Sequence, residues 1–289
     1  MPGEDIIITV EKEALLLQFL LQHLKQKSRD NVKSMLRYRQ VWVDGRVVSQ
    51  FNHPLRPGQL VTIKKDRQTD ANLNRYFRIV FEDEHIVVID KQAGLLSISA
   101  GSEHLTAYGL LSSYLKQKDP AGKIFVVHRL DRDTSGVMMF AKSEQVQTLL
   151  QKAWQTGIRE RTYMALVEGK VEKPAGTIRS YLTESKAFVV HSSKDPDKGE
   201  LAITHFRTLK SNPDYSLLEV SLETGKKNQI RVHMQDIGHS IVGDKKYGAN
   251  GNPIGRLGLH ASVLAFTHPV SGEQLRFASD IPARFLRLF

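Results

Sequence analysis

From Arg78 to its end, the chain is dominated by short apolar runs, each about as long as one β-strand. Such runs, rich in β-branched and aromatic residues and closed by glycines such as Gly94 and Gly169, favour strands over helices. We predict strands at 79–81, 86–89, 124–127, 137–140, 162–168, 187–191, 202–209, 216–222, 229–234 and 260–266, and one helix near 144–156. Because strands outnumber helices and run in clusters, the sequence predicts one sheet-rich α+β domain.

The segment before residue 66 has a different pattern, in which helices precede strands. Apolar residues recur at helical spacing over 12–26, so an amphipathic helix is predicted there. Ser28 can cap a second short helix with an apolar face at Val32 and Leu36. Asp44-Gly45, between two valine-rich runs, predicts a tight hairpin, and a further strand is predicted at 60–63.

These patterns divide the chain into two predicted domains. Residues 1–66 form a small α/β module, and residues 78–289 form the sheet-rich domain. The polar stretch DRQTDANLN, from Asp66 to Asn74, has no period, so residues 67–77 are predicted to be a linker.

The chain carries 41 Lys and Arg against 31 Asp and Glu, a net charge of +10, which favours a polyanionic partner without identifying one. Positive charge is concentrated between His23 and Arg39, where Asp30 is the one acidic residue. The basic residues of this run are Lys25, Lys27, Arg29, Lys33, Arg37 and Arg39. A solvated helix surface is the alternative interpretation of any single one of them.

The chain contains no cysteine, which excludes thiol catalysis, iron–sulfur clusters and cysteine-based zinc sites. Its first residues lack the basic start of a signal peptide, and no window approaches 18 consecutive apolar residues. We therefore expect a cytoplasmic protein that makes no membrane contact.

Three segments could carry chemistry. HRLDRDTSG, from His128 to Gly136, places charged and hydroxyl side chains between two apolar strands, although an ordinary charged turn has the same composition. TGKKNQIRVH, from 224 to 233, places Arg231 and His233 on one face of a predicted strand, where a solvated arginine is the plain alternative. Tyr163 opens a third apolar run, in which a tyrosine is more commonly a core or edge residue.

Together these segments resemble the RluA-type pseudouridine synthases. HRLDRDTSG resembles their H-R-L-D-x-x-T-S-G motif, and RTYMALVEG their tyrosine-bearing strand. TGKKNQIRVHMQDIGHSIVGDKKYG resembles their third motif, and FEDEHIVVIDKQAG and LGLHASVLAFTHPVSGEQLRF their first strand and C-terminal pattern. The chain departs from the family at Gln92 and Ser240, where proline is usual, and at Lys226 and Asn228, where arginine and histidine are usual.

The front segment has a resemblance of its own. SRDNVKSMLRYRQVWVDGRVVSQFNHPLRPGQLVTI is similar to the S-four domain, a small RNA-binding fold that many members of this synthase family carry in front of the catalytic domain. The resemblance implies that the basic run is an RNA-binding face. For the second domain it implies the pseudouridine synthase fold, with a mixed, mostly antiparallel sheet.

The resemblance also implies a reaction and its residues. Asp131 is the expected catalytic carboxylate, Arg231 its partner, and Tyr163 the residue that stacks on uracil. Attack on the sugar, addition to the base and removal of a ribose proton are all open to Asp131. Arg129 is expected to fill the space of a uridine flipped out of a stem, which costs a few kcal/mol. His128, Lys226 and Lys227 are expected to contact RNA.

Pseudouridine and uridine are isomers, so we expect no cofactor and no metal. The expected partner is RNA, ribosomal first and transfer RNA next, bound by a monomer without an obligate protein partner. Two other hypotheses remain open: an RNA-binding protein that has lost turnover, suggested by Lys226 and Asn228, and a metal-dependent hydrolase using His233 and His239. No H-E-x-x-H motif supports the hydrolase.

Overall fold

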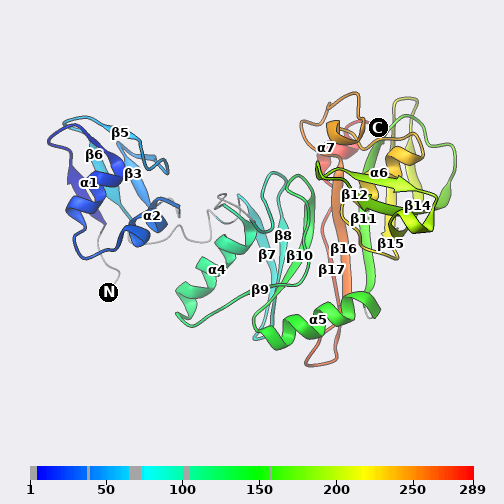
Figure 1. Ribbon diagram of the computed structural model, residues 1–289, viewed down its shortest axis with the longest axis horizontal. Helices are drawn as coiled ribbons and strands as arrows, with labels where there is room; N and C mark the ends of the chain where they lie inside the picture. The colour runs from blue at the N-terminus through cyan, green and yellow to red at the C-terminus, as the bar shows by residue number, and fades with distance from the viewer. Residues whose placement is uncertain (1–4, 38–39, 65–72, 74, 100–104, 157) are drawn as a thin grey trace. The chain divides into compact units, whose positions relative to one another are not determined.

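The structure, a computed structural model, describes residues 5–37, 40–64, 73, 75–99, 105–156 and 158–289 (Figure 1). The chain divides into two compact units, and each is described by itself. The first unit contains residues 1–75 and 99–121, and the second contains residues 76–98 and 122–289. Most of the predicted linker, residues 67–72 and 74, lies outside the described residues.

The first unit contains a four-stranded sheet and two helices that share one core. Its strands lie in the order β1 (Ile6–Thr9), β6 (Leu60–Ile63), β3 (Val41–Val43) and β4 (Arg46–Val47). A separate small pair is formed by β2 (Ala14–Leu15) and β5 (Pro54–Leu55). Its helices are α1 (Leu16–His23), α2 (Arg29–Arg37) and α4 (Ala107–Lys118). Leu20 and Val32 are fully buried in the core between α1, α2 and the sheet.

Local signals in this unit are confirmed by the structure, with one difference in length. The Ser28 hydroxyl accepts a hydrogen bond of 3.2 Å from the amide of Asn31 and so caps α2. Asp44 and Gly45 have φ of 47° and 75°, which is the conformation of a tight hairpin turn. The first helix is shorter than the predicted 12–26, because Leu15 pairs with Pro54 as a strand before Leu16 begins the helix.

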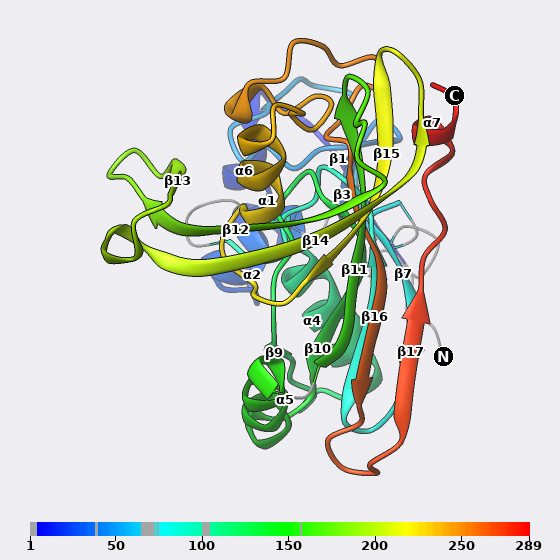
Figure 2. The ribbon, with the colours of Figure 1, turned by 90° about the vertical axis from the view of Figure 1, so that its right-hand side faces the viewer.

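The second unit is built on an eleven-stranded sheet (Figures 1 and 2). Its main order is β13 (Val190–Ser193), β12 (Ala175–Glu184), β14 (Glu200–Ser211), β15 (Tyr215–Leu222), β11 (Ile158–Glu168), β16 (Leu259–Thr267), β10 (Ser135–Ala141), β8 (Ile86–Lys91) and β7 (Phe77–Glu82). Two further strands, β17 (Gln274–Ala278) and β9 (Phe125–Val126), pair with β16 and β10. Neighbouring strands are antiparallel except for β10 and β16. The predicted mixed, mostly antiparallel sheet is confirmed.

Few helices accompany this sheet. They are α5 (Glu144–Thr156), α6 (Gln229–Asp236) and the short α7 (Ala283–Leu286), with 3-10 turns at Pro196–Lys198 and Lys245–Tyr247. The predicted helix near 144–156 is confirmed. In Figure 2 strands β12, β13 and β14 extend sideways from the rest of the sheet, and α6 lies beside them. Within the described residues, no helix is long and apolar enough to cross a membrane.

The strand predicted at 229–234 is wrong, because this segment is the helix α6. The alternation of Ile230 and Val232 with polar residues suggested a period of two, but Ile230, His233 and Met234 are buried together at helical spacing. The side chain of Gln229 starts the helix, since its Oε1 accepts the Lys226 amide at 3.0 Å. Strands β12 and β17 were not predicted from the sequence.

Gly136 allows β10 and β16 to come together at the centre of the sheet. It has a φ of 114°, and a Cβ at this position would lie 2.1 Å from the carbonyl oxygen of Ala261. Any larger residue would therefore force the parallel pair apart. This close approach fixes the end of β10 immediately after the polar segment that begins at His128.

Candidate active site

The loop that carries Asp131 lies between β9 and β10 and is held by its neighbours. The Ser97 hydroxyl donates to the Leu130 carbonyl at 2.7 Å and accepts from the Leu130 amide at 3.1 Å. The Thr134 amide donates to the Asp131 carbonyl at 3.2 Å and closes a turn. These bonds position the backbone on both sides of Asp131, so its side chain projects from a fixed place.

Lys91 supports the same loop from inside the protein. Its side chain is fully buried, and its ammonium donates to the carbonyls of Gln92, Leu95 and Arg132 at 3.0, 2.7 and 3.0 Å. Desolvation, with added repulsion from Arg256, lowers the pKa of Lys91 to about 7. A buried lysine that satisfies three carbonyls connects the end of β8 to the Asp131 loop.

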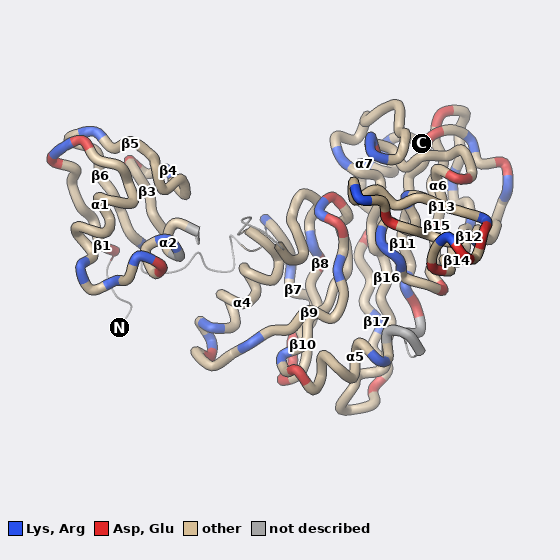
Figure 3. Tube along the Cα trace, viewed as in Figure 1, with Lys and Arg blue, Asp and Glu red and all other residues tan. Residues whose placement is uncertain are grey.

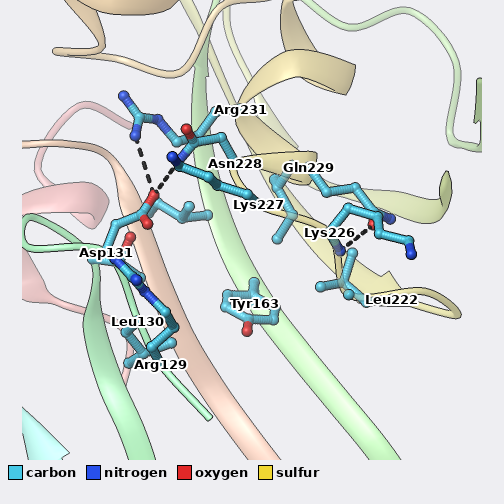
Figure 4. Close-up of a pocket in the computed structure, with 14 residues that line it drawn as sticks. Arg129, Leu130, Asp131, Tyr163, Leu222, Lys226, Lys227, Asn228, Gln229 and Arg231 are labelled. Carbon is cyan, nitrogen blue, oxygen red and sulfur yellow. Dashed lines mark hydrogen bonds and ion pairs between the residues drawn. The ribbon is translucent and has the colours of Figure 1, made fainter. Parts of the chain in front are cut away.

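The Asp131 carboxylate accepts two hydrogen bonds on one oxygen (Figure 4). Nδ2 of Asn228 lies 2.6 Å from Oδ2, and Nη1 of Arg231 lies 3.1 Å from the same atom. Within the described part of the chain no group donates to Oδ1. The predicted pairing of Asp131 with Arg231 is thus present, and it leaves one carboxylate oxygen available to a substrate.

Arg231 is itself fixed by Asp244. Its Nε and Nη2 donate to the two Asp244 oxygens at 2.6 and 2.7 Å, and the Asp244 side chain is 1% exposed. The Tyr247 ring lies 4.8 Å from the guanidinium carbon. Burial opposes the charged form, but the hydrogen bonds and charges of Asp244 and Asp131 outweigh it and raise the pKa of Arg231 above its ordinary value. The arginine is therefore a permanent cation with a fixed orientation.

Asn228 is held in an orientation that makes it a donor to Asp131. It has a φ of 53°, in the left-handed region that asparagine and histidine adopt more readily than most residues. The Tyr247 hydroxyl donates to Asn228 Oδ1 at 3.1 Å and accepts from the Val190 amide at 3.2 Å. Because Oδ1 is occupied as an acceptor, Nδ2 is the atom directed at Asp131.

A cavity of about 290 Å³ opens beside this carboxylate. Asp131, Asn228 and Arg231 lie on one side of it and Tyr163, from β11, lies on its wall (Figure 4). Desolvation raises the pKa of Tyr163 to about 12, and the negative charge of Asp131 acts in the same direction. The phenol is therefore neutral near pH 7 and presents a ring and a hydroxyl to the cavity.

The predicted RNA contacts near the loop have different surroundings. Arg129 is exposed at the cavity rim. Lys226 and Lys227 also line the cavity, and they pair with Glu200 and Glu184. A second cavity, of about 580 Å³, shares Asp131, Asn228, Arg231 and Lys227 with the first, and Lys245 and Lys246 line it. Asp131 thus lies between two cavities with cationic walls.

His128 is placed differently from the exposed residues. Its Nε2 accepts a hydrogen bond of 3.1 Å from the Met139 amide. Desolvation, with repulsion from Arg161, lowers the pKa of His128 to about 3. The ring is therefore neutral near pH 7 and lacks the charge with which a histidine binds phosphate.

The basic residues of the first unit lie on the turn after α1 and on α2. Lys25, Lys27, Arg29 and Lys33 are exposed, and Arg37 is the last residue of α2. Figure 3 shows this turn and the start of α2 as a run of positive segments interrupted by one acidic segment. Arg39 lies outside the described residues.

The two histidines considered as metal ligands have other partners. His233 is fully buried, with Nε2 2.9 Å from the Ser180 hydroxyl and Nδ1 2.8 Å from that of Thr204. His239 Nδ1 lies 2.9 Å from the Glu168 carbonyl. Among the described residues, no group of three or more histidine, aspartate or glutamate side chains could hold a metal ion. Both histidines connect structural elements.

Sequence reasoning did not single out Lys91, Asp244 or Tyr247 as site residues. Asp244 and Tyr247 lie in the segment GDKKYG, which formed part of the resemblance but carried no assigned role. Their function becomes visible when the fold places them behind Arg231 and Asn228. Lys91 follows a strand as one of many charged residues, and nothing in the sequence marks it as buried.

The sheet and the carboxylate pocket define a class of RNA-modifying enzyme. The family model described as RNA pseudouridylate synthase matches residues 85–236. An uncharacterized RNA pseudouridine synthase of Bacillus subtilis, YjbO, is 36% identical over 73% of this chain and 74% of its own. A ribosomal large subunit pseudouridine synthase D of Haemophilus ducreyi is 30% identical over 99% of this chain and 94% of its own.

This chain belongs to the RNA pseudouridine synthase family, and to its RluA type, whose members are enzymes that isomerise uridine to pseudouridine. The solved structure of human RNA pseudouridylate synthase domain containing 4 shares the fold, with a TM-score of 0.61, 23% identity and coverage of 75% of this chain and 92% of its own. The resemblance of the second domain to this family is confirmed.

Proposed function

We propose that this enzyme acts on specific uridines of structured ribosomal RNA and that Asp131 is its catalytic carboxylate. The observation that carries the proposal is the position of Asp131. One of its oxygens is held by Asn228 and Arg231, and the other is available beside the cavity that contains Tyr163. Ribosomal RNA is preferred to transfer RNA because relatives of similar length are named for the large ribosomal subunit.

The isomerisation breaks the bond between ribose C1′ and uracil N1 and forms one between C1′ and C5. The proton on C5 leaves, and N1 of the rotated base gains one, so atoms and electrons balance without a redox partner. Asp131 supplies a negative charge at the ribose or the base, and Arg231 keeps that carboxylate ionised and oriented. Tyr163 stacks on the uracil and places a neutral hydroxyl near C5, where the proton leaves.

The substrate uridine must leave its stack to reach this cavity. We assign Arg129, at the rim, to the space that the base vacates, and Lys226 and Lys227 to phosphates beside it. His128 receives a different role from the one expected. Because it is neutral and accepts the Met139 amide, it positions the loop and does not bind phosphate.

We further propose that residues 1–66 are an S-four-like RNA-binding domain. Its helices and small sheet agree with that fold, and Lys25, Lys27, Arg29 and Lys33 are available to phosphates on its surface. With RNA bound by both units, the enzyme acts as a monomer without a partner protein and without a cofactor.

Mapping of pseudouridine in defined RNA tests the substrate assignment. Unmodified ribosomal RNA transcripts and unmodified transfer RNA transcripts are incubated separately with the enzyme or with its Asp131→Asn variant. We expect pseudouridine at a small number of positions in ribosomal RNA, and none with the variant. Modification of transfer RNA alone would overturn the ribosomal assignment, and absence of modification in both would overturn the proposed activity.

A further inference from the structure

Phe188 is an aromatic residue that the fold leaves in solvent. It lies in the turn between β12 and β13, in the part of the sheet that extends sideways in Figure 2. Its exposed fraction is 70%, the highest among the large apolar side chains in the described part of the chain. A ring of this size loses favourable burial when it remains in water, so its exposure calls for a physical reason.

The backbone of the turn holds the ring outward. Phe188 has a φ of 58°, a conformation that bulky residues rarely adopt. Its amide donates to the Ser185 carbonyl at 2.9 Å, and the Ser185 amide donates to the Val189 carbonyl at 2.8 Å. The ammonium of Lys246 donates to the Phe188 carbonyl at 2.7 Å. The exposed ring is therefore attached to a turn whose conformation is fixed on several sides.

Lys227 joins this ring to the active site. Its ammonium lies 5.5 Å from the centre of the Phe188 ring and pairs with Glu184 at the end of β12. The same lysine lines both cavities beside Asp131, and Lys246 lines the second of them. Phe188 is thus one side chain away from the pocket, in surroundings that carry positive charge.

We propose that Phe188 is a stacking platform for an unpaired nucleobase of the substrate RNA, next to the uridine that enters the pocket. Proteins that bind unstacked nucleotides combine an aromatic face for the base with cations for the phosphates, which is the arrangement of Phe188, Lys227 and Lys246. Every base has a face that can stack, so this contact holds the strand that leaves the pocket without selecting its sequence. The proposal rests on the proposed function and extends its binding site along the strand.

Three substitutions of Phe188 separate stacking from folding and from apolar contact. F188G removes the ring and relieves the backbone, because glycine adopts a positive φ without strain, so the variant remains folded. F188L keeps an apolar side chain but lacks a flat face. F188W keeps a flat face and adds a fluorescent group. Leu149→Ala, on α5, is the matched control because it also shortens an exposed apolar side chain, on a helix at the other end of the unit from α6 (Figure 1).

The affinity of the full-length variants is measured for a ribosomal RNA fragment, with tritium release measured on the same fragment. We expect F188G and F188L to raise Kd by about 5- to 150-fold, the range of one lost base–aromatic stack. F188W and Leu149→Ala should bind as the wild type does. Emission of F188W, after subtraction of the wild-type signal, should be quenched when RNA is added.

An F188G affinity equal to that of the wild type overturns the inference, since the ring would then serve another occupant such as a protein surface. Absence of quenching in F188W, with its affinity retained, overturns it as well. These outcomes differ from failure of the proposed function. If the wild type releases no tritium, the assigned reaction fails, whereas the Kd comparison still decides whether Phe188 contacts RNA.

Discussion

Arg231 bonds to Asp131 through one nitrogen at 3.1 Å while the other two nitrogens of its guanidinium are held by Asp244. The exposed fractions of the side chains fall from 30% for Asp131 to 14% for Arg231 and 1% for Asp244. The arginine therefore joins a buried carboxylate to one that faces the cavity. Because its orientation is fixed from behind, the carboxylate in front is oriented before any substrate arrives.

Removing the buried charge should damage both stability and activity. Asp244→Asn keeps the shape of the side chain but leaves the buried Arg231 with one carboxylate partner instead of two. We expect the free energy of unfolding to fall by about 3 kcal/mol. We also expect kcat to fall more than KM rises, because Arg231 loses its orientation.

Urea unfolding and tritium-release kinetics measure the two effects. Asp195→Asn, which changes an exposed aspartate in the turn after β13, is the control and should shift stability by less than about 0.5 kcal/mol. Wild-type kinetics in Asp244→Asn would show that Arg231 needs no support from behind.

A second carboxylate beside Asp131 should make activity depend on pH. Asn228→Asp places two carboxylates where Asn228 Nδ2 now donates to Asp131 at 2.6 Å. Like charges this close share a proton, so the apparent pKa of the pair rises. We expect at least a tenfold loss of kcat near pH 7, with recovery as the pH rises toward about 9.

The control for this experiment is Asn228→His, which restores the residue usual in the family. Histidine tolerates the left-handed backbone and retains a nitrogen donor, so its rate near pH 7 should stay close to that of the wild type. A flat pH profile for Asn228→Asp would show that position 228 does not act on Asp131.

The neutral ring of His128 should make the protein less stable in acid. The folded ring binds a proton only at a pKa of about 3, whereas the unfolded ring binds one at its ordinary value of 6.5. Between these values the unfolded state holds more protons, so stability rises with pH and is lost as the pH falls below about 6.5. His128→Gln keeps an acceptor for the Met139 amide but cannot titrate.

Urea unfolding at several pH values between about 7 and 4 measures this effect, and His128→Gln should lose less stability than the wild type over that range. The other buried histidines are unchanged in the variant and contribute equally to both curves. Parallel curves would show that His128 does not carry the acid sensitivity assigned to it.

The basic run of the first unit should set the salt dependence of RNA binding. In a variant with Lys25→Gln, Lys27→Gln and Lys33→Gln, up to three phosphate contacts are lost. The slope of log affinity against log salt should then become shallower by about 0.9 for each contact made to duplex RNA. The matched triple variant Lys170→Gln, Lys173→Gln and Lys210→Gln changes exposed lysines of the second unit. Equal slopes in both variants would identify the run as a solvated helix surface.

Much of the sheet could be predicted from local sequence because most of its strands bury one or both faces. Strand β10 is buried along its whole length, and the apolar run at 137–140 marks it. Strand β12 was missed because it lies in the part of the sheet that extends sideways, where most of its residues are exposed or half-buried and its alternation is weak.

The site was predictable to the extent that its motifs are contiguous. Asp131, Tyr163 and Arg231 each lie in a segment with a family resemblance, and the structure brings all three to one cavity. The helical state of 229–236 could not be decided locally, because a short run such as IRVH fits both periods. The roles of Asp244 and Tyr247 depend on long-range contacts, which no local pattern contains. The catalytic roles and the domain boundaries remain predictions.

The most direct test of the central claim is tritium release from ribosomal RNA labelled at uridine C5, with wild type, Asp131→Asn and Asp133→Asn compared at equal concentration. Asp133 lies in the same loop, is exposed and accepts no hydrogen bond on its side chain from the described residues. We expect at least about a 100-fold loss of rate for Asp131→Asn and a rate within about twofold of wild type for Asp133→Asn. Release by Asp131→Asn at the wild-type rate would contradict the assignment of Asp131 as the catalytic carboxylate.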